Sequence, residues 1–216
     1  MSTNILPMAI AGAALLTLTT TGTAQAVTFF TNRTAWESAV GRFTTETFDA
    51  PVANAPVITF ANGVTSTGSG GSILNEIGGG TYLGRVDTSG NFPDHFREIR
   101  WVFPKPVFGF AADWIDTTTG SGLTVSGNFD GSGVQTISFR DRLGDPGTGF
   151  LGIVGIASFS ELVFREEVAV FGDIGDEFFQ VDNLSTTVVP TPALLPGLIG
   201  LGLGIWRKRK PEAMTD

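Results

Sequence analysis

The chain contains no cysteine, and His95 is its only histidine. Without cysteine there is no disulfide framework, no thiolate ligand for a metal and no thiol nucleophile. One histidine is too few for the usual zinc sites. The chain also lacks the Gly-x-Ser-x-Gly motif that holds the nucleophile of many serine hydrolases. We therefore expect His95 to be an exposed loop residue, which leaves carboxylates as the candidates for acid–base chemistry.

Positive charge is also scarce in this chain. It has 13 Lys and Arg residues against 21 Asp and Glu residues, and a net charge of −8. Four of these cations stand together at positions 207–210, so the preceding chain is more acidic than the total indicates. An acidic protein repels phosphate backbones and anionic lipids, which argues against nucleic acid and anionic membrane surfaces as partners. Divalent cations and neutral glycans remain compatible with this charge.

An apolar run near the N-terminus predicts a secretory signal peptide. Residues 9–18 are apolar, and Ala24-Gln25-Ala26 fits the small-x-small rule of signal cleavage. We therefore expect residues 1–26 to be removed after Ala26, with Ala24 and Ala26 as the recognition residues. The positively charged start of such signals is missing, because no Lys or Arg precedes Arg33.

The C-terminal stretch combines three features in a fixed order. A proline-punctuated extended site comes first, an uncharged apolar run over residues 193–206 follows, and a cationic stop-transfer signal closes it. The site is Pro190, Thr191, Pro192 and Ala193, and the cations are Arg207, Lys208, Arg209 and Lys210. As a helix the apolar run reaches about 20 Å against a hydrocarbon core of about 30 Å, which indicates a temporary anchor. Two alternatives remain: a terminal helix packed on the domain, and a permanent anchor formed by residues 194–206.

This tail resembles the PEP-CTERM sorting signal, in the variant whose motif reads Pro-Thr-Pro-Ala. The resemblance implies an exported protein of a Gram-negative bacterium, held in the inner membrane until an exosortase-type transpeptidase cuts near the motif. The family is associated with bacteria that make exopolysaccharide. Thr191 replaces the usual acidic residue, which points to a different matching protease. Residues 188–210 are then the sorting signal with its short transmembrane helix, and residues 211–216 are a cytoplasmic tail.

Between the two ends, residues 27–187 predict one all-β domain, an antiparallel β-sandwich with one short N-terminal helix. Short β-prone runs alternate with turn signals, and 29 glycines with 18 phenylalanines suit tight turns around an aromatic core. Asn62-Gly63 and residues 130–133 are the clearest hairpin turns. The expected strands are residues 27–30, 44–48, 57–60, 64–66, 73–74, 81–83, 99–103, 107–115, 123–129, 134–139, 150–157, 160–165, 168–171 and 178–184.

Two local signals refine this pattern. Thr34 and Glu37 form a capping box, which predicts a helix over residues 34–40 that ends at Gly41. Pro104 and Pro106 are expected to stop the strand that reaches Phe103.

The order of these strands resembles the jelly-roll sandwiches of lectin-like and carbohydrate-binding modules. The matching landmarks are residues 47–49, 108–110 and 179–184. In such folds a structural calcium often ties the first strands to the last, so the resemblance implies Asp182 as a ligand, with Asp49 or Glu46 across the sheet.

Calcium is the candidate cofactor, because the acidic loop before the last strand offers several carboxylates on a flexible backbone. Asp173 and Asp176 lie within this loop, and calcium prefers six to eight oxygen ligands. The predicted metal ligands are therefore Asp173, Asp176 and Asp182, together with Asp49, which only the resemblance implies. A solvated acidic loop without metal is the alternative.

A glycan site needs exposed aromatic rings, because the apolar faces of sugars stack on them. Trp101, Trp114 and Tyr82 are the candidate ligand-binding residues, with core packing as the alternative for each. A glycan hydrolase needs two carboxyl groups instead, for which the pairs Asp113 with Asp116 and Glu166 with Glu167 are available.

The sequence thus predicts an exported, surface-sorted protein without catalytic residues. Its role is expected to be structural or binding, with exopolysaccharide as the candidate ligand and the cell surface or extracellular matrix as its destination. The alternative is a carboxylate-dependent hydrolase acting on glycans from the same sandwich.

Overall fold

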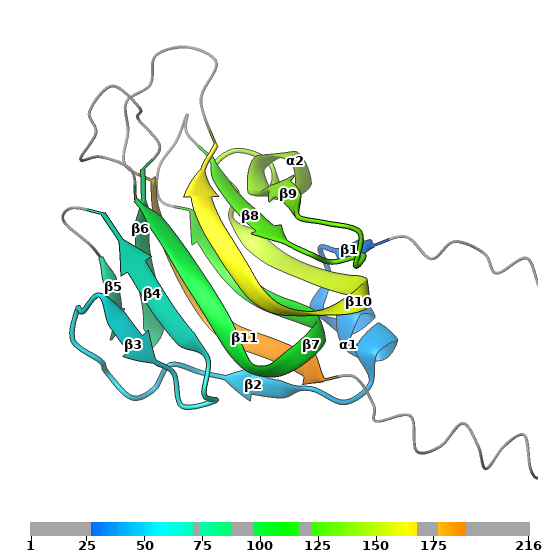
Figure 1. Ribbon diagram of the computed structural model, residues 1–216, viewed down its shortest axis with the longest axis horizontal. Coiled ribbons are helices and arrows are strands. Elements are labelled where there is room, and N and C mark those ends of the chain that lie inside the picture. Colours follow the sequence, from blue (N-terminus) through cyan, green and yellow to red (C-terminus); the bar gives the residue numbers. More distant parts are fainter. Residues whose placement is uncertain (1–26, 71–73, 88–96, 117–121, 168–176, 189–216) are drawn as a thin grey trace, which may run out of the picture.

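The computed structural model describes residues 27–70, 74–87, 97–116, 122–167 and 177–188. These residues form an antiparallel sheet of 11 strands with two short helices, so the expected all-β fold is confirmed (Figure 1). In chain order the elements are β1 (Thr28–Phe30), α1 (Arg33–Val40), β2 (Thr44–Glu46), β3 (Val57–Thr59), β4 (Thr65–Ser69), β5 (Asn75–Gly78), β6 (Thr81–Val86), β7 (Glu98–Asp116), β8 (Leu123–Gly127), β9 (Gln135–Ser138), α2 (Phe139–Leu143), β10 (Gly149–Glu166) and β11 (Glu177–Val188).

The two longest strands, β7 and β10, pair with each other and divide the sheet into two arms. The first arm contains β3, β4, β8 and β9, joined by residues 98–102 of β7 and 161–166 of β10. The second arm contains β1, β2, β5, β6 and β11, joined by residues 107–116 of β7 and 149–154 of β10. Figure 1 shows β7 and β10 bending side by side between the arms.

The bend explains why the expected stop at Pro104 and Pro106 is wrong. β4 pairs with β7 as far as Val102, and β11 pairs with it from Val107 onward. Both prolines lie in the interval where β7 exchanges partners, so their missing N–H groups remove no bond from the ladder. For the same reason the two segments expected at residues 150–157 and 160–165 are one strand, β10, whose register shifts between them.

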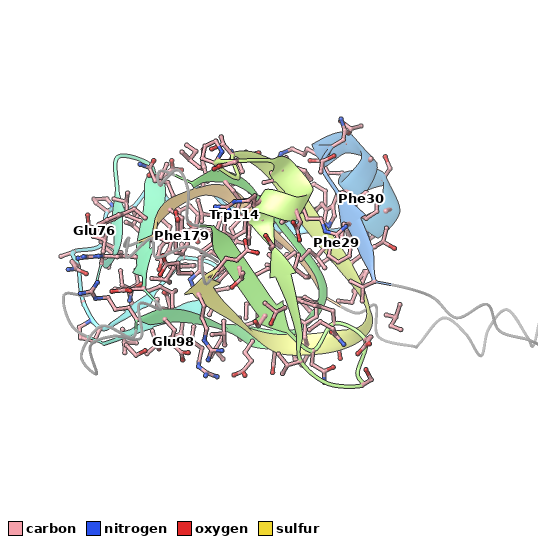
Figure 2. The ribbon with its side chains drawn as sticks, turned by 90° about the horizontal axis from the view of Figure 1, so that it is seen from above. Phe29, Phe30, Glu76, Glu98, Trp114 and Phe179 are labelled. Atoms are coloured by element: carbon pink, nitrogen blue, oxygen red, sulfur yellow. The ribbon has the colours of Figure 1, made fainter. Side chains whose placement is uncertain are left out.

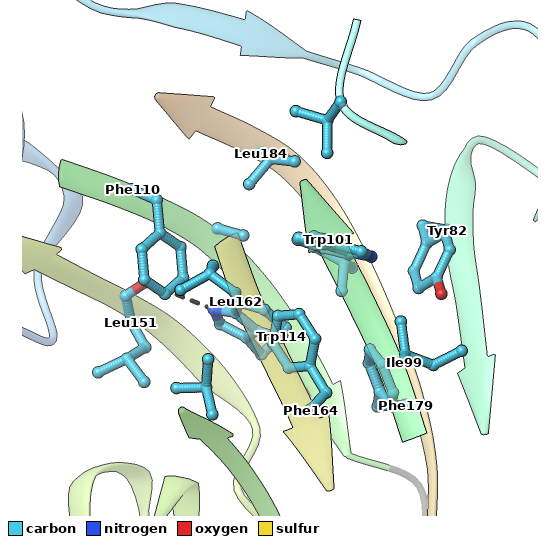
Figure 3. Close-up of a cluster of buried hydrophobic side chains, with 14 of the residues drawn as sticks. Tyr82, Ile99, Trp101, Phe110, Trp114, Leu151, Leu162, Phe164, Phe179 and Leu184 are labelled. Atoms are coloured by element: carbon cyan, nitrogen blue, oxygen red, sulfur yellow. Dashed lines mark hydrogen bonds between the residues drawn. The ribbon is translucent and has the colours of Figure 1, made fainter. Parts of the chain in front are cut away.

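One aromatic core lies between the arms (Figure 3). Trp101 of the first arm stacks on Trp114 of the second, with ring centroids 6.2 Å apart. Phe164 contacts both indoles, at 4.7 Å from Trp101 and 5.6 Å from Trp114. Because aromatic pairs add about 0.5–1.5 kcal/mol beyond the burial of their area, these contacts hold the arms together.

Local sequence signals correctly predicted the two hairpins and helix α1, but they misplaced the N-cap of the helix. β3 pairs with β4 around Asn62-Gly63, and β8 pairs with β9, as expected. Helix α1 ends at Gly41, whose φ is 74°. Its N-cap, however, is Asn32 and not Thr34, because the Asn32 side chain accepts the backbone N–H of Ala35 at 3.0 Å. Helix α2 was not expected, since residues 134–139 read as a strand.

Candidate functional site

A hollow of about 520 Å³ opens on the outer face of the first arm. Figure 2 shows Glu98 on the outside of the sheet, whereas Trp114 and Phe179 lie inside it. The strands β7, β8 and β10 and the segment of residues 128–134 supply the walls. The lining residues are Arg100, Pro106, Ser126, Gly127, Asn128, Val134, Ser158, Phe159, Ser160, Glu161, Val163 and Arg165.

Strand alternation places these side chains outside. Ile99, Trp101, Leu162 and Phe164 are fully buried, so their neighbours one residue along each strand point to the opposite, outer face, where Val163 is still only 9% exposed. This period-2 pattern of charges between large apolar residues is the sequence signal that could have located the hollow.

Two arginines and two glutamates form an ion network beside the hollow. Arg100 donates to Glu161 at 2.9 Å and lies 3.4 Å from Glu98, and Arg165 donates to Glu98 at 2.7 Å. The hydrogen bond and charge of Glu161 raise the pKa of Arg100 above its usual value, although burial opposes this shift. Because the guanidinium groups are partly exposed, we expect the pairs to fix side-chain positions more than to stabilise the fold.

Hydroxyl groups extend the polar face around this network. Ser126 and Thr136 share a hydrogen bond of 2.8 Å, and Thr124 donates to the Arg165 carbonyl at 2.9 Å. In the neighbouring segment, the backbone and hydroxyl of Ser132 donate to Asp130 and lower the pKa of that carboxyl. The face therefore presents many donors and acceptors with balanced charge around one hollow.

The aromatic residues predicted to bind ligand are not at this face. Trp101 and Tyr82 are fully buried and Trp114 is 1% exposed. The prediction that these three rings stack on a sugar is therefore wrong. Trp114 donates to the Leu151 carbonyl at 3.4 Å, and Tyr82 donates to the Asn75 side chain at 3.0 Å. Sequence could not separate these roles because aromatic residues in strands serve cores and ligand faces alike.

The predicted calcium ligands are only partly described by the structure. Asp173 and Asp176 lie outside the described residues. Asp49 is exposed and accepts the Thr47 hydroxyl at 2.6 Å, whereas Asp182 accepts the Asn183 backbone N–H at 2.6 Å. Within the described part of the chain, no three His, Cys, Asp or Glu residues gather as a metal site.

Glu46, the other residue implied for calcium, has a structural role in the described domain. It is 6% exposed, and its carboxylate accepts the backbone N–H groups of Phe48 at 3.0 Å and Asn62 at 2.8 Å. A buried carboxylate held by two such donors fixes the turn that follows β2.

The carboxylate pairs weighed for hydrolysis are engaged elsewhere. Asp113 forms a salt bridge of 2.8 Å with Arg33 and accepts from Asn183 at 3.0 Å, on the outer face of the second arm. Glu166 is buried, and Glu167 accepts the Ser138 hydroxyl at 2.8 Å. The side chain of Asp116 is outside the described set.

The predicted processing sites cannot be placed on this fold. Residues 1–26, His95 and residues 189–216 lie outside the described residues, so the signal cleavage site, the sorting motif and the stop-transfer cations do too. Among the helices that the structure describes, none has the length and apolarity needed to cross a bilayer.

The chain matches no protein-family profile, no characterised protein and no solved structure at a significant level.

Proposed function

We propose that this protein is an exported surface module, held in the inner membrane by residues 188–210 and released by an exosortase-type transpeptidase that cuts near Pro190. The position of β11 carries the proposal. Its ladder with β7 ends at Val188, two residues before Pro190, so a cut at the motif leaves every described strand intact. Residues 1–26 precede the first described strand in the same way, as a removable signal peptide requires.

The folded part is, in this proposal, a β-sandwich of the jelly-roll type with the two arms as its layers. The stacking of Trp101 on Trp114 across the arms supports two packed layers. Strands that switch layers at bends form the corners of packed sheets, and β7 and β10 switch layers in this way.

The proposed role is non-catalytic binding of polysaccharide at the hollow of the first arm. Hydroxyl, amide, guanidinium and carboxylate groups surround it, which suits the many hydroxyls of a sugar. The two arginines and two glutamates of the ion network balance in charge, so a neutral glycan fits better than a polyanion.

A hydrolase is the alternative function, because Glu161 lines the hollow and Glu98 contacts two of its lining arginines. Arg100 contacts both carboxylates, and Arg165 also holds Glu98. This pairing favours a positional role, since a glycosidase needs one carboxyl group free to donate a proton. Formation of new reducing ends from a polysaccharide, abolished by Glu161→Gln, would establish the hydrolase instead.

The sorting proposal is tested by the intact mass of protein released at the cell surface. We expect a species that begins at Val27 and ends near the motif. A Pro190→Ala/Pro192→Ala double variant should keep its C-terminal tail and stay in the membrane, whereas Pro196→Ala, outside the motif, should still be processed. Surface-released wild-type protein that retains Lys210 would refute processing.

The binding proposal is tested on a glycan array with a variant that fills the hollow. Ser160→Met places a larger side chain in the lining and should abolish any binding that the wild type shows. Thr67→Met is the matched control, because Thr67 lies on the same face beside Arg100 but outside the lining. No signal from the wild type, or equal loss in both variants, would contradict a site in the hollow.

A further inference from the structure

The first and last described strands begin and end at the same edge of the second arm. Thr28 of β1 is the register partner of Val154, Val154 is the partner of Gly109, and Gly109 is the partner of Thr187 in β11. These four residues form one row across the sheet. With roughly 4.8 Å between neighbouring strands, the row is about 14 Å wide.

The strand directions show that the described chain enters the sheet at this row and leaves it at the same row. β1 runs from Thr28 away from the row, and β11 runs toward it and ends one residue later, at Val188. Figure 1 agrees, with β1 and the tip of β11 on the same side of the molecule. The predicted signal peptide ends two residues before Thr28, so both membrane-directed segments leave from this edge. We call this part of the molecule the terminal end.

Apolar side chains are exposed at the terminal end. Val188 is 54% exposed, and Phe43 is 37% exposed beside Arg42, whose carbonyl accepts the Thr187 hydroxyl at 2.8 Å. Ile156 is 44% exposed, and its backbone N–H donates to the Phe129 carbonyl at 2.9 Å. This hydrogen bond joins the bend of β10 to the segment of residues 128–134, which includes Phe129 and Val134.

Val134 is the most exposed of these residues, at 75%. Its segment lies against the bend of β10, because a Cβ atom added at Gly131 would meet the Ala157 side chain at 3.1 Å. Exposed Lys105 stands at the neighbouring bend of β7. An exposed apolar surface with a cation beside it suits the interface of a bilayer.

The length of the tether decides what covers this surface. The apolar run begins at Ala193, five residues after Val188, and five extended residues reach at most about 17 Å. The opposite edge of the second arm, near Ile115, lies six residues along β7 from Gly109, which is about 20 Å at strand rise. A membrane-held tail therefore keeps the terminal end within about 17 Å of lipid, whereas the opposite edge can lie about 20 Å farther away.

We propose that the terminal end is a lipid-facing surface, which rests on a zwitterionic bilayer through Phe43, Ile156 and Val188 while the tail holds the protein, with Val134, which also lines the hollow, at its border. This inference rests on the proposed anchoring by residues 193–206. It adds an orientation, in which the edge of the second arm near Ile115 points away from the membrane before the protein is released.

The chain offers a matched pair of positions for the test, and its lack of cysteine allows labelling at one site. Ile156 and Ile115 are 44% and 41% exposed and lie toward opposite edges of the second arm. Full-length Ile156→Cys and Ile115→Cys proteins would carry an environment-sensitive fluorophore and be reconstituted in phosphatidylcholine vesicles. A fraction of the lipid would bear a nitroxide quencher near its headgroup. Val134→Cys serves as a second reporter of the terminal end.

We expect strong quenching and a blue shift for the labels at Ile156 and Val134, and neither for the label at Ile115. Flotation of the same vesicles reports anchoring separately. Protein that floats but shows equal quenching at all three positions would overturn the orientation and leave the anchor intact. Protein that fails to float would overturn the anchor, and the orientation with it. Thermal melts of the labelled proteins confirm that each is folded.

Discussion

Trp36 occupies the space beside Gly152 into which any larger side chain would project. A Cβ atom at Gly152 would lie 2.5 Å from the Trp36 ring and 3.1 Å from the Ala111 Cβ. Trp36 is fully buried and donates to the Ile153 carbonyl at 3.5 Å, so helix α1 docks on β10 at this point. The sequence contains 29 glycines, and only the contact across elements shows which of them have this role.

We expect Gly152→Ala to lower the free energy of unfolding by about 1–3 kcal/mol, because overpacking displaces Trp36. Denaturant unfolding followed by tryptophan fluorescence measures the change. Gly78→Ala is the control, since a Cβ atom there meets only Leu83 at an ordinary 3.7 Å. Equal destabilisation by both variants would show that Trp36 does not need this space.

Tyr82 is the only tyrosine of the chain, and it lies in a buried polar network. Its hydroxyl bonds to Asn75 at 3.0 Å and to Ser66 at 3.2 Å. Burial raises the pKa of Tyr82 well above its usual 10.0, against the smaller opposing effect of the Ser66 hydrogen bond. The folded state therefore holds the phenolic proton at a pH where the unfolded chain releases it.

The sign of the pH effect follows from this shift. The stabilising contribution of the neutral phenol is complete below pH 10 and falls as pH rises above the unfolded pKa. We expect the ultraviolet absorbance of phenolate to appear only together with unfolding, whereas the chain in denaturant should titrate near 10. Phenolate absorbance that rises near pH 10 in a protein with native circular dichroism would contradict the buried position.

At the scale of elements, helix α1 shows how a strong local signal can be misplaced. The capping box of Thr34 and Glu37 correctly predicts a helix there, but the N-cap is Asn32, two residues earlier. The side chain of Asn32 accepts the Ala35 N–H at 3.0 Å, while the Thr34 carbonyl accepts the Ser38 hydroxyl within the helix. Two acceptable caps compete in the sequence, and the docking of Trp36 on β10 sets the helix start.

Replacing the true cap should cost more than replacing the apparent one. We expect Asn32→Ala to lower the free energy of unfolding by about 1 kcal/mol, through loss of the bond to an otherwise unpaired helix N–H. Thr34→Ala should have a much smaller effect, because alanine favours the helix interior. Thermal unfolding of both variants shows which substitution destabilises the protein more. A larger loss of stability in Thr34→Ala would identify Thr34 as the N-cap.

Strands β7 and β10 show a different limit of sequence interpretation. Each was expected as separate short strands, because Pro104, Pro106 and polar residues interrupt the β-prone runs. In the fold these interruptions are bends at which the strand changes partners. Proline predicts the loss of a backbone donor, but whether that loss ends a strand depends on a neighbour that is distant in sequence.

At the scale of the whole molecule, calcium binding stays a prediction because half of its proposed ligands lie outside the described residues. Calcium that binds only the folded state should raise the melting temperature above that measured with chelator. An Asp173→Asn/Asp176→Asn double variant should narrow this difference. Thermal melts that coincide with calcium and with chelator would end the calcium hypothesis.

Composition and local pattern alone determined the all-β class, the paired hairpins, the helix near Trp36 and the three-part tail on which the export proposal rests. These features depend on a few neighbouring residues, so their physical causes are visible in the sequence. Only the tertiary structure decided that Trp101, Trp114 and Tyr82 face inward, that the hollow lies on the first arm, and that Thr28 and Thr187 share one row. Each of these depends on which strands pair, and pairing is set by contacts between residues far apart in the chain.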